Sequence, residues 1–135
     1  GIIPVLVGSG PGESQKAAEI AAKMDIPPID LVGKLNFKQL ACLFQQSAAV
    51  VGGDTGPTHL AVGIGARTVM LMGPTYPRRT GPYGQMDNLL VADRDCCECM
   101  KRACPLGHDC LVVIKPEQVE EKLKALVPAL AAVSI

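Results

Sequence analysis

The sequence contains no tryptophan and few aromatic residues of any kind, which excludes some function classes at once. It has two phenylalanines and two tyrosines, and aromatic residues make up 3% of its 135 residues. Proteins that bind single-stranded nucleic acid stack bases on aromatic side chains, so this composition argues against that class. An excess of one charge is lacking too, because 13 Lys and Arg balance 13 Asp and Glu. No basic field is therefore available to attract nucleic acid or anionic lipid.

Long apolar runs are also missing. The stretch ALVPALAAVSI near the C-terminal end is shorter than the roughly 20 residues that a membrane-spanning helix needs. The first residues show no charged-then-apolar secretion signal. We therefore expect a soluble, cytoplasmic protein without a transmembrane segment. The chain begins with Gly1 and the apolar run IIPVLVG rather than with a methionine, and from this we expect a piece of a longer protein.

Glycine and proline, by contrast, are abundant, at 14 and 11 residues, so turns specify much of the fold. Short runs of valine, isoleucine and leucine alternate with longer segments of helical periodicity. This alternation predicts one α/β domain over residues 1–135, a Rossmann-like parallel sheet with helices on both faces. We expect strands at residues 2–7, 29–32, 48–52, 68–72, 88–92 and 110–114, and helices at residues 13–24, 37–46, 57–65 and 116–132.

Two of these helices carry further signals. Asn36 is a favourable N-cap for the helix at residues 37–46, because its side chain can accept a backbone N–H of the first turn. The buried stripe of that helix is expected to consist of Phe37, Leu40, Ala41 and Phe44. Pro128 is expected to kink or end the last helix.

The segment GGDTGPTH, residues 52–59, follows a predicted buried strand and opens a helix. Its two glycines allow a tight turn, and Thr55 can cap the helix. Pro57 suits the first helical position, where its missing N–H would have been unpaired in any case. An ordinary capped turn has the same sequence, so the motif alone leaves a structural and a binding role open.

The binding role rests on backbone donors at the helix start. The N–H groups of Gly56, Thr58 and His59 are expected to point out of the helix, where they can bind phosphate with help from the helix dipole. A carboxylate repels phosphate, so we expect Asp54 to hold the turn or to accept hydroxyl protons from a sugar.

Two other Gly-rich segments follow predicted strands, VGSGPGE at residues 7–13 and MGPTYPRRTGPYG at residues 72–84. All three segments are expected to converge, because ligands bind beyond the carboxyl ends of parallel strands. GSGPGE departs from the dinucleotide fingerprint G-x-G-x-x-G. Glu13 can accept ribose hydroxyls, although the residues alone favour a first-turn carboxylate stabilised by the helix dipole. Arg78 and Arg79 can contact an anionic acceptor, although solvation is the favoured interpretation.

Cysteines cluster in CCECMKRACPLGHDC, residues 96–110. The cluster consists of Cys96, Cys97, Cys99, Cys104 and Cys110, with His108 among them. Zinc binds such residues, but the spacing counted from Cys97 departs from the paired C-x2-C pattern, and disulfides are not expected in the cytosol. We therefore expect a reduced, tightly turned loop and no metal, with a zinc-stabilised Cys-rich module as the alternative.

Three stretches together resemble the C-terminal part of the lipopolysaccharide heptosyltransferases, glycosyltransferase family 9. They are GPGE, LVGKLNFKQLACLFQQSAAVVGGDTGPTHLAVGIGARTVMLMGPTYPRRTGPYG and CCECMKRACPLGHDCLVVIKPEQV. The family resemblance implies a B-type glycosyltransferase with two Rossmann-like domains, of which this chain lacks the N-terminal, acceptor-binding half. It implies that the opening, central strand of the C-terminal half is missing too. We therefore expect a gap between the strands at residues 2–7 and 48–52.

The resemblance also implies a reaction. Members bind a nucleotide sugar, typically ADP-heptose, and transfer the heptose with inversion to a lipid-linked saccharide acceptor in lipopolysaccharide biosynthesis, with no cofactor or obligatory metal. The catalytic base is expected in the absent half, so this fragment alone is expected to be inactive. The implied donor-binding residues are Glu13 at the ribose, Lys34 and Leu35 at the adenine, and Asp54, Thr55, Gly56, Pro57, Thr58 and His59 around the diphosphate and sugar.

Two alternatives stay open. A helix end binds any diphosphate and Leu35 discriminates poorly between bases, so the donor can be another nucleotide sugar. The second alternative is the non-catalytic zinc module. For the enzyme, we expect a cytoplasmic location, at the inner membrane face if it is peripheral.

Overall fold

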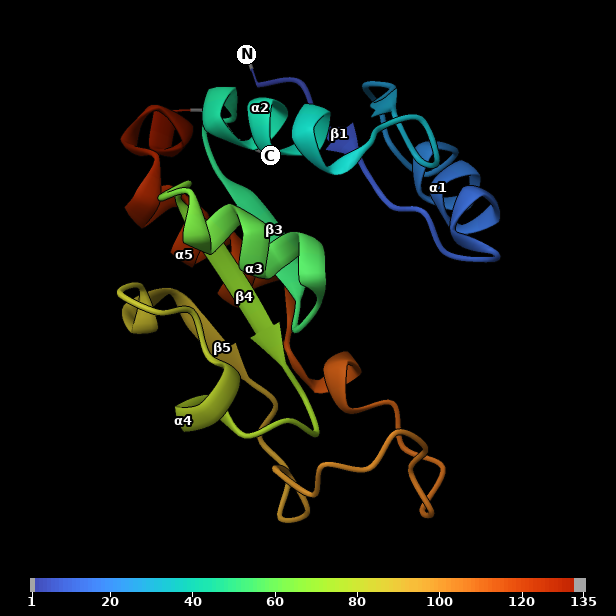
Figure 1. Cartoon of the computed structure of the whole chain (residues 1–135), viewed down its shortest axis with the longest axis vertical. Coiled ribbons are helices and arrows are strands. Elements are labelled where there is room, and N and C mark those ends of the chain that lie inside the picture. Colours follow the sequence, from blue (N-terminus) through green and yellow to red (C-terminus); the bar gives the residue numbers. More distant parts are fainter. Residues whose placement is uncertain (1, 133–135) are drawn as a thin grey trace. The chain divides into compact units, whose positions relative to one another are not determined.

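The computed structural model describes residues 2–132 and divides into two compact units, one ending at Leu40 and the other beginning at Ala41. The first unit contains β1 (Val5–Leu6), α1 (Glu13–Ala21) and β2 (Ile29–Asp30), drawn in blue to cyan in Figure 1. Its two strands run parallel. α2 (Phe37–Gln46) begins in the first unit and ends in the second.

The second unit is built on three parallel strands in the order β3 (Val50–Gly53), β4 (Thr68–Met72) and β5 (Leu89–Val91). Its core lies along β4, where Val69, Met70 and Met72 are fully buried. α3 (Gly56–Gly63) and α5 (Pro116–Leu126) lie on opposite faces of this sheet (Figure 1). Since both faces are covered, the central strand is almost continuously apolar rather than alternating.

Short elements complete the second unit. They are α4 (Pro77–Thr80) and the 3-10 turns Met86–Asn88, Cys110–Val113 and Pro128–Ala132. None of the helices within residues 2–132 has both the length and the apolar character needed to cross a membrane. The fold is the α/β arrangement predicted from the sequence, with parallel strands and flanking helices.

α2 has the predicted bounds because its start is fixed by local chemistry. The Asn36 side chain accepts the N–H of Gln39, and the Gln39 side chain accepts the N–H of Asn36, each at 3.0 Å. This reciprocal capping satisfies two N–H groups that the helix itself cannot pair. The predicted buried stripe is correct for Leu40 and Phe44 but wrong for Phe37, which is 67% exposed. The packed part of the stripe begins at Leu40, one turn after the start of the helix.

The strand predicted at residues 110–114 is wrong, because Cys110–Val113 forms a 3-10 turn. The Asp109 carboxylate accepts the N–H of Leu111 at 3.1 Å, which favours a helical turn over an extended chain. The last predicted helix ends early, as Pro128 suggested, with a 3-10 turn continuing beyond it. The predicted helix at residues 13–24 is also shorter, since α1 stops at Ala21.

The strands form two separate sheets rather than one. β1 pairs with β2, and β3 to β5 pair among themselves, and within residues 2–132 no ladder joins β1 to β3. This agrees with the break predicted between the strands at residues 2–7 and 48–52. In the second unit, Gly53 at the end of β3 pairs with Leu71 near the end of β4. The chain segments that leave these two strands therefore start at the same sheet edge.

Candidate functional site: the N-terminus of α3 and its polar network

The chain leaves β3 and enters α3 within a few residues. Thr55 occupies the N-cap position with an extended backbone, and Pro57 lies in the first turn, as predicted. The Thr55 side chain, however, forms no capping hydrogen bond, so that part of the prediction is wrong. Its hydroxyl lies 3.1 Å from the hydroxyl of Thr58 instead. The two threonine hydroxyls thus form a hydrogen bond with each other.

The two glycines before the turn were predicted to allow a tight turn, but the structure gives Gly52 a different role. Neither Gly52 nor Gly53 has a positive φ, so the turn does not need their conformational freedom. A Cβ on Gly52 would lie 2.3 Å from the Thr58 hydroxyl oxygen. Thr58 is 3% exposed and cannot easily move aside. Glycine at position 52 therefore makes room for the first turn of α3 to pack against β3.

The backbone donors at the start of α3 are fewer than the sequence suggested. The N–H of His59 donates to the carbonyl of Thr55 at 3.0 Å and is therefore not free. Pro57 has no N–H. Within residues 2–132, no hydrogen bond to another protein group engages the N–H of Gly56 or of Thr58. These two groups remain available at the positive end of the helix.

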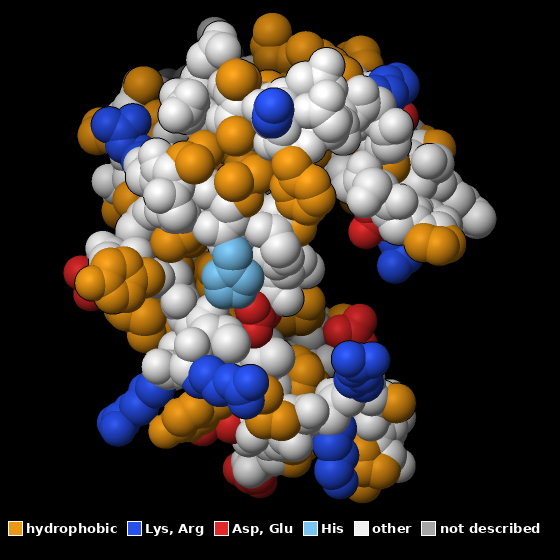
Figure 2. Space-filling view, viewed as in Figure 1, with side chains coloured by type: hydrophobic (Ala, Val, Ile, Leu, Met, Phe, Trp, Pro, Cys, Tyr) orange, Lys and Arg blue, Asp and Glu red, His pale blue; other side chains and the backbone are white. Residues whose placement is uncertain are grey.

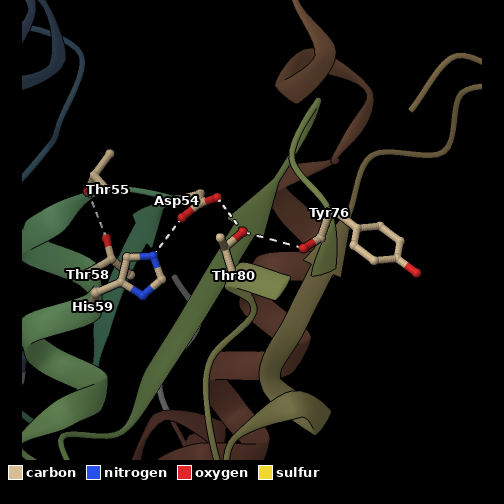
Figure 3. A network of polar contacts seen from close by, with 6 residues as sticks. All are labelled: Asp54, Thr55, Thr58, His59, Tyr76 and Thr80. Atoms are coloured by element: carbon tan, nitrogen blue, oxygen red, sulfur yellow. Dashed lines mark hydrogen bonds and ion pairs between the residues drawn. The ribbon is translucent and has the colours of Figure 1, made fainter. Parts of the chain in front are cut away.

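Asp54 lies at the centre of a side-chain network (Figure 3). Its Oδ1 lies 2.6 Å from Nε2 of His59, and its Oδ2 accepts a hydrogen bond from the Thr80 hydroxyl at 2.8 Å. The Asp54 side chain is 14% exposed and the imidazole 40% exposed. These two contacts are the ones expected of an Asp54 side chain that holds the turn.

Burial raises the pKa of Asp54, since a carboxylate loses hydration there. The hydrogen bond from His59 and the hydroxyls of Thr75 and Thr80 all lower this pKa, and together they outweigh the effect of burial. The pKa of Asp54 is therefore held below its usual value, although the Thr75 hydroxyl is buried and forms no hydrogen bond of standard geometry. An ionised Asp54 can only accept protons, so Nε2 of His59 carries the shared one.

Sequence reasoning missed Thr80 as a member of this network. It lies 26 residues from Asp54 in the sequence, at the end of α4. The available signal was the expected convergence of residues 52–59 and 72–84, which this hydrogen bond confirms. Arg78 and Arg79 of the same helix are exposed, in line with the favoured interpretation. Figure 2 shows a histidine at the surface next to an acidic side chain, with Lys and Arg side chains on the same face.

The first unit contains the other predicted binding residues, beginning with Glu13. Its Oε2 accepts the N–H groups of Ser9 at 2.6 Å and of Gly10 at 2.8 Å. The donors on Gly10 and Ser9 hold the pKa of Glu13 below its usual value. A Cβ on Gly8 would lie 2.2 Å from the same oxygen. The carboxylate thus closes the loop after β1, and glycine at position 8 makes room for it.

Lys34 and Leu35 lie in the turn after β2. The Lys34 ammonium donates to the carbonyl of Asp30 at 2.7 Å, and Leu35 is half-buried. Gly33 has a φ of 72°, which bends the chain here. Its N–H donates to the carbonyl of Gly8 at 2.7 Å, so the loops that carry Lys34 and Glu13 are directly joined.

The cysteine-rich loop forms a pocket of about 370 Å³. Its lining includes Cys96, Cys99, Cys104, His108 and Cys110. The first two make a C-x2-C pair that the spacing counted from Cys97 overlooks. Within residues 2–132, however, no group of three or more Cys, His, Asp or Glu side chains is arranged to hold a metal ion. All six thiols are free.

Comparison with known proteins gives a consistent picture. The family model of glycosyltransferase family 9 (heptosyltransferase) matches residues 1–109. Lipooligosaccharide heptosyltransferase 2 of Campylobacter jejuni is 31% identical over 127 residues, covering 90% of this chain and 40% of that protein. Lipopolysaccharide heptosyltransferase 1 of Pseudomonas aeruginosa is 29% identical over 132 residues, which cover 87% of this chain and 37% of that protein.

Two solved structures are similar as well. The glycosyl transferase family 9 structure from Veillonella parvula has a TM-score of 0.80 and 28% identity, covering 94% of this chain and 37% of that one. The E. coli ADP-heptose lps heptosyltransferase II has a TM-score of 0.75 and 28% identity, covering 98% and 38%. This chain thus spans about two fifths of the length of the proteins it matches.

Proposed function

The chain belongs to glycosyltransferase family 9, the heptosyltransferases, and from that membership we propose that it is the donor-binding part of a lipopolysaccharide heptosyltransferase. In this proposal the complete enzyme transfers heptose from ADP-heptose to a lipid-linked saccharide, with inversion at the anomeric carbon. Residues 1–135 form an incomplete C-terminal Rossmann-like domain. An N-terminal domain binds the acceptor and supplies the catalytic base. The enzyme works in the cytoplasm, at the inner membrane face.

The observation that carries the proposal is the N-terminus of α3. The unpaired N–H groups of Gly56 and Thr58 stand at the positive end of the helix, next to the half-exposed imidazole of His59. Such donors stabilise a diphosphate, both when it is bound and when it departs as the leaving group. No Cβ occupies the space beside Gly56, where a substituent would meet nothing within 4 Å. That space suits an oxygen-rich ligand approaching the backbone.

The Asp54–His59 pair determines which charged groups face the proposed diphosphate. The two side chains lie 2.6 Å apart, so the negative charge of Asp54 is directed at His59 rather than at the diphosphate. In the proposed reaction, a doubly protonated His59 donates from Nδ1 to the diphosphate while the sugar is displaced, and its Nε2 stays on Asp54. Asp54 orients the ring and keeps its proton on Nε2.

The first unit provides the proposed nucleoside contacts. Oε2 of Glu13 holds the loop, whereas within residues 2–132 no hydrogen bond engages Oε1, so one carboxylate oxygen remains to accept ribose hydroxyl protons. Lys34 and Leu35 are joined to the same loop through Gly33 and Gly8. We propose that they border the adenine. These assignments follow the family resemblance and the local geometry of this unit alone.

A transfer assay tests the function. The complete protein, incubated with ADP-heptose and a lipopolysaccharide acceptor lacking its outer sugars, is expected to add one heptose, detected as a mass increase of the acceptor. The isolated 135-residue chain is expected to add none, because the base lies outside it. Transfer by the isolated chain contradicts the division into two halves. If the protein transfers sugar efficiently from another nucleotide sugar and not from ADP-heptose, ADP-heptose is rejected as the donor.

A further inference from the structure

Thr80 contacts the Asp54–His59 pair from a different part of the chain than the pair itself. Asp54 uses one carboxylate oxygen for His59 and the other for Thr80, at 2.6 Å and 2.8 Å. The Thr80 hydroxyl has a second acceptor nearby, the carbonyl of Tyr76, at 3.4 Å. It has a single proton, and the shorter contact to an ionised acceptor receives it. The carboxylate is therefore fixed from both sides (Figure 3).

The backbone around α4 is built to place this hydroxyl. The N–H of Thr80 donates to the carbonyl of Tyr76 at 3.1 Å, and the N–H of Gly81 donates to the carbonyl of Pro77 at 2.8 Å. A Cβ on Gly81 would lie 2.4 Å from the Pro77 carbonyl oxygen, so only glycine permits this tight turn. Thr75 lies at the start of the same segment, and its buried hydroxyl has no hydrogen-bond partner within residues 2–132.

From this geometry we propose that Thr80 is a positioning residue for the transfer reaction: it holds Asp54 in the rotamer that orients His59 toward the donor diphosphate. This inference rests on the proposed function and adds to it. Thr80 itself touches neither the donor nor the reacting atoms. Within residues 2–132, His59 is the titratable side chain that faces Asp54. Loss of the Thr80 hydroxyl therefore affects the Asp54–His59 pair.

The test compares three variants of the complete protein. Thr80→Val keeps the shape and removes the donor, Thr80→Ser restores the donor, and Thr68→Val removes a buried hydroxyl elsewhere, one that donates to the carbonyl of Ala66. A hydrogen bond to a charged group is worth enough that Thr80→Val is expected to lower kcat/KM about ten- to a hundredfold. Thr80→Ser is expected to stay within about threefold of the parent, since its donor is retained. Thr68→Val is expected to lower Tm and leave kcat/KM unchanged.

The pH profile separates positioning from mere stability. Removing a donor to the ionised carboxylate raises the pKa of Asp54, so the acid limb of kcat/KM moves to higher pH in Thr80→Val and stays in place in Thr80→Ser and Thr68→Val. An unshifted acid limb in Thr80→Val overturns the proposal, as does a loss of activity equal to that of Thr68→Val.

A carbon-13 NMR titration of the Asp54 carboxyl group tests the role of Thr80 without requiring sugar transfer. Its pKa is expected to be higher in Thr80→Val than in the parent protein. Should the complete protein transfer no sugar at all, the proposed function fails, and this titration still decides the Thr80 inference. An unchanged Asp54 pKa rejects it.

Discussion

Replacing Gly52 by alanine tests whether close packing of β3 on α3 shapes the donor turn. The new Cβ would lie 2.3 Å from Oγ1 of Thr58 and 3.5 Å from its Cβ and Cγ2. The backbone of Gly52 is not left-handed, so alanine causes no conformational strain there. Any destabilisation must therefore come from the contact. Thr58 is nearly fully buried, and its hydroxyl can leave only by breaking its 3.1 Å contact with Thr55.

Forcing extra atoms into a filled site costs about 1–3 kcal/mol. Replacing glycine by alanine recovers about 0.4–1 kcal/mol through the unfolded chain. The central expectation is a net loss of about 1.3 kcal/mol, the difference between the midpoints of these two ranges. At roughly 4 °C per kcal/mol, this lowers Tm by about 5 °C in thermal unfolding followed by circular dichroism. Gly53→Ala is the matched control, because its Cβ would meet only the Leu71 carbonyl oxygen, at 3.8 Å. Equal stability of the two variants refutes the packing argument, as does a Gly52→Ala defect that remains when Thr58 is also alanine.

Two further predictions concern the carboxylates. Gly8→Ala places a Cβ 2.2 Å from Oε2 of Glu13 and should displace that carboxylate, which weakens ADP binding measured by calorimetry. In a Glu13→Ala background, Gly8→Ala should leave ADP binding unchanged. A further loss of ADP binding in that background contradicts the mechanism. The folded-state pKa of Asp54 is depressed, so its charge stabilises the fold above an unfolded pKa of about 3.9, and that contribution is lost as the pH falls through the folded value. Urea unfolding at pH 7 and pH 3 should therefore show a smaller loss on acidification for Asp54→Asn than for the parent, and equal losses argue against a stabilising Asp54 charge.

The parts of the fold that local chemistry determines could be predicted from the sequence. The start of α2 follows from the reciprocal capping of Asn36 and Gln39, and the start of α3 follows closely from Pro57. The segment at residues 110–114 could not be predicted in this way. Its apolar residues are typical of a strand, but the hydrogen bond from Leu111 to Asp109 favours a turn.

The candidate site was predictable as a location but not as a network. The motif placed Asp54 and His59 at the same helix start, but it did not predict that their side chains pair. It did not show that the His59 N–H is used within the helix, because that depends on where the first helical hydrogen bond closes. Nor did it show Thr80, whose contact with Asp54 spans 26 residues and depends on how β3 and β4 align. Long-range pairings of this kind are set by the tertiary structure.

The central claim is that the N-terminus of α3 binds the diphosphate of a nucleotide-sugar donor. Calorimetric titration of the complete protein with ADP tests it most directly, comparing Gly56→Val at the start of α3 with Gly63→Val at its end. A Cβ at either position meets nothing within 4 Å, so both variants should fold. The account predicts that Gly56→Val weakens ADP binding by at least about tenfold, equivalent to about 1.4 kcal/mol, while Gly63→Val binds as the parent does. Equal ADP affinity in the parent protein and in Gly56→Val would contradict it.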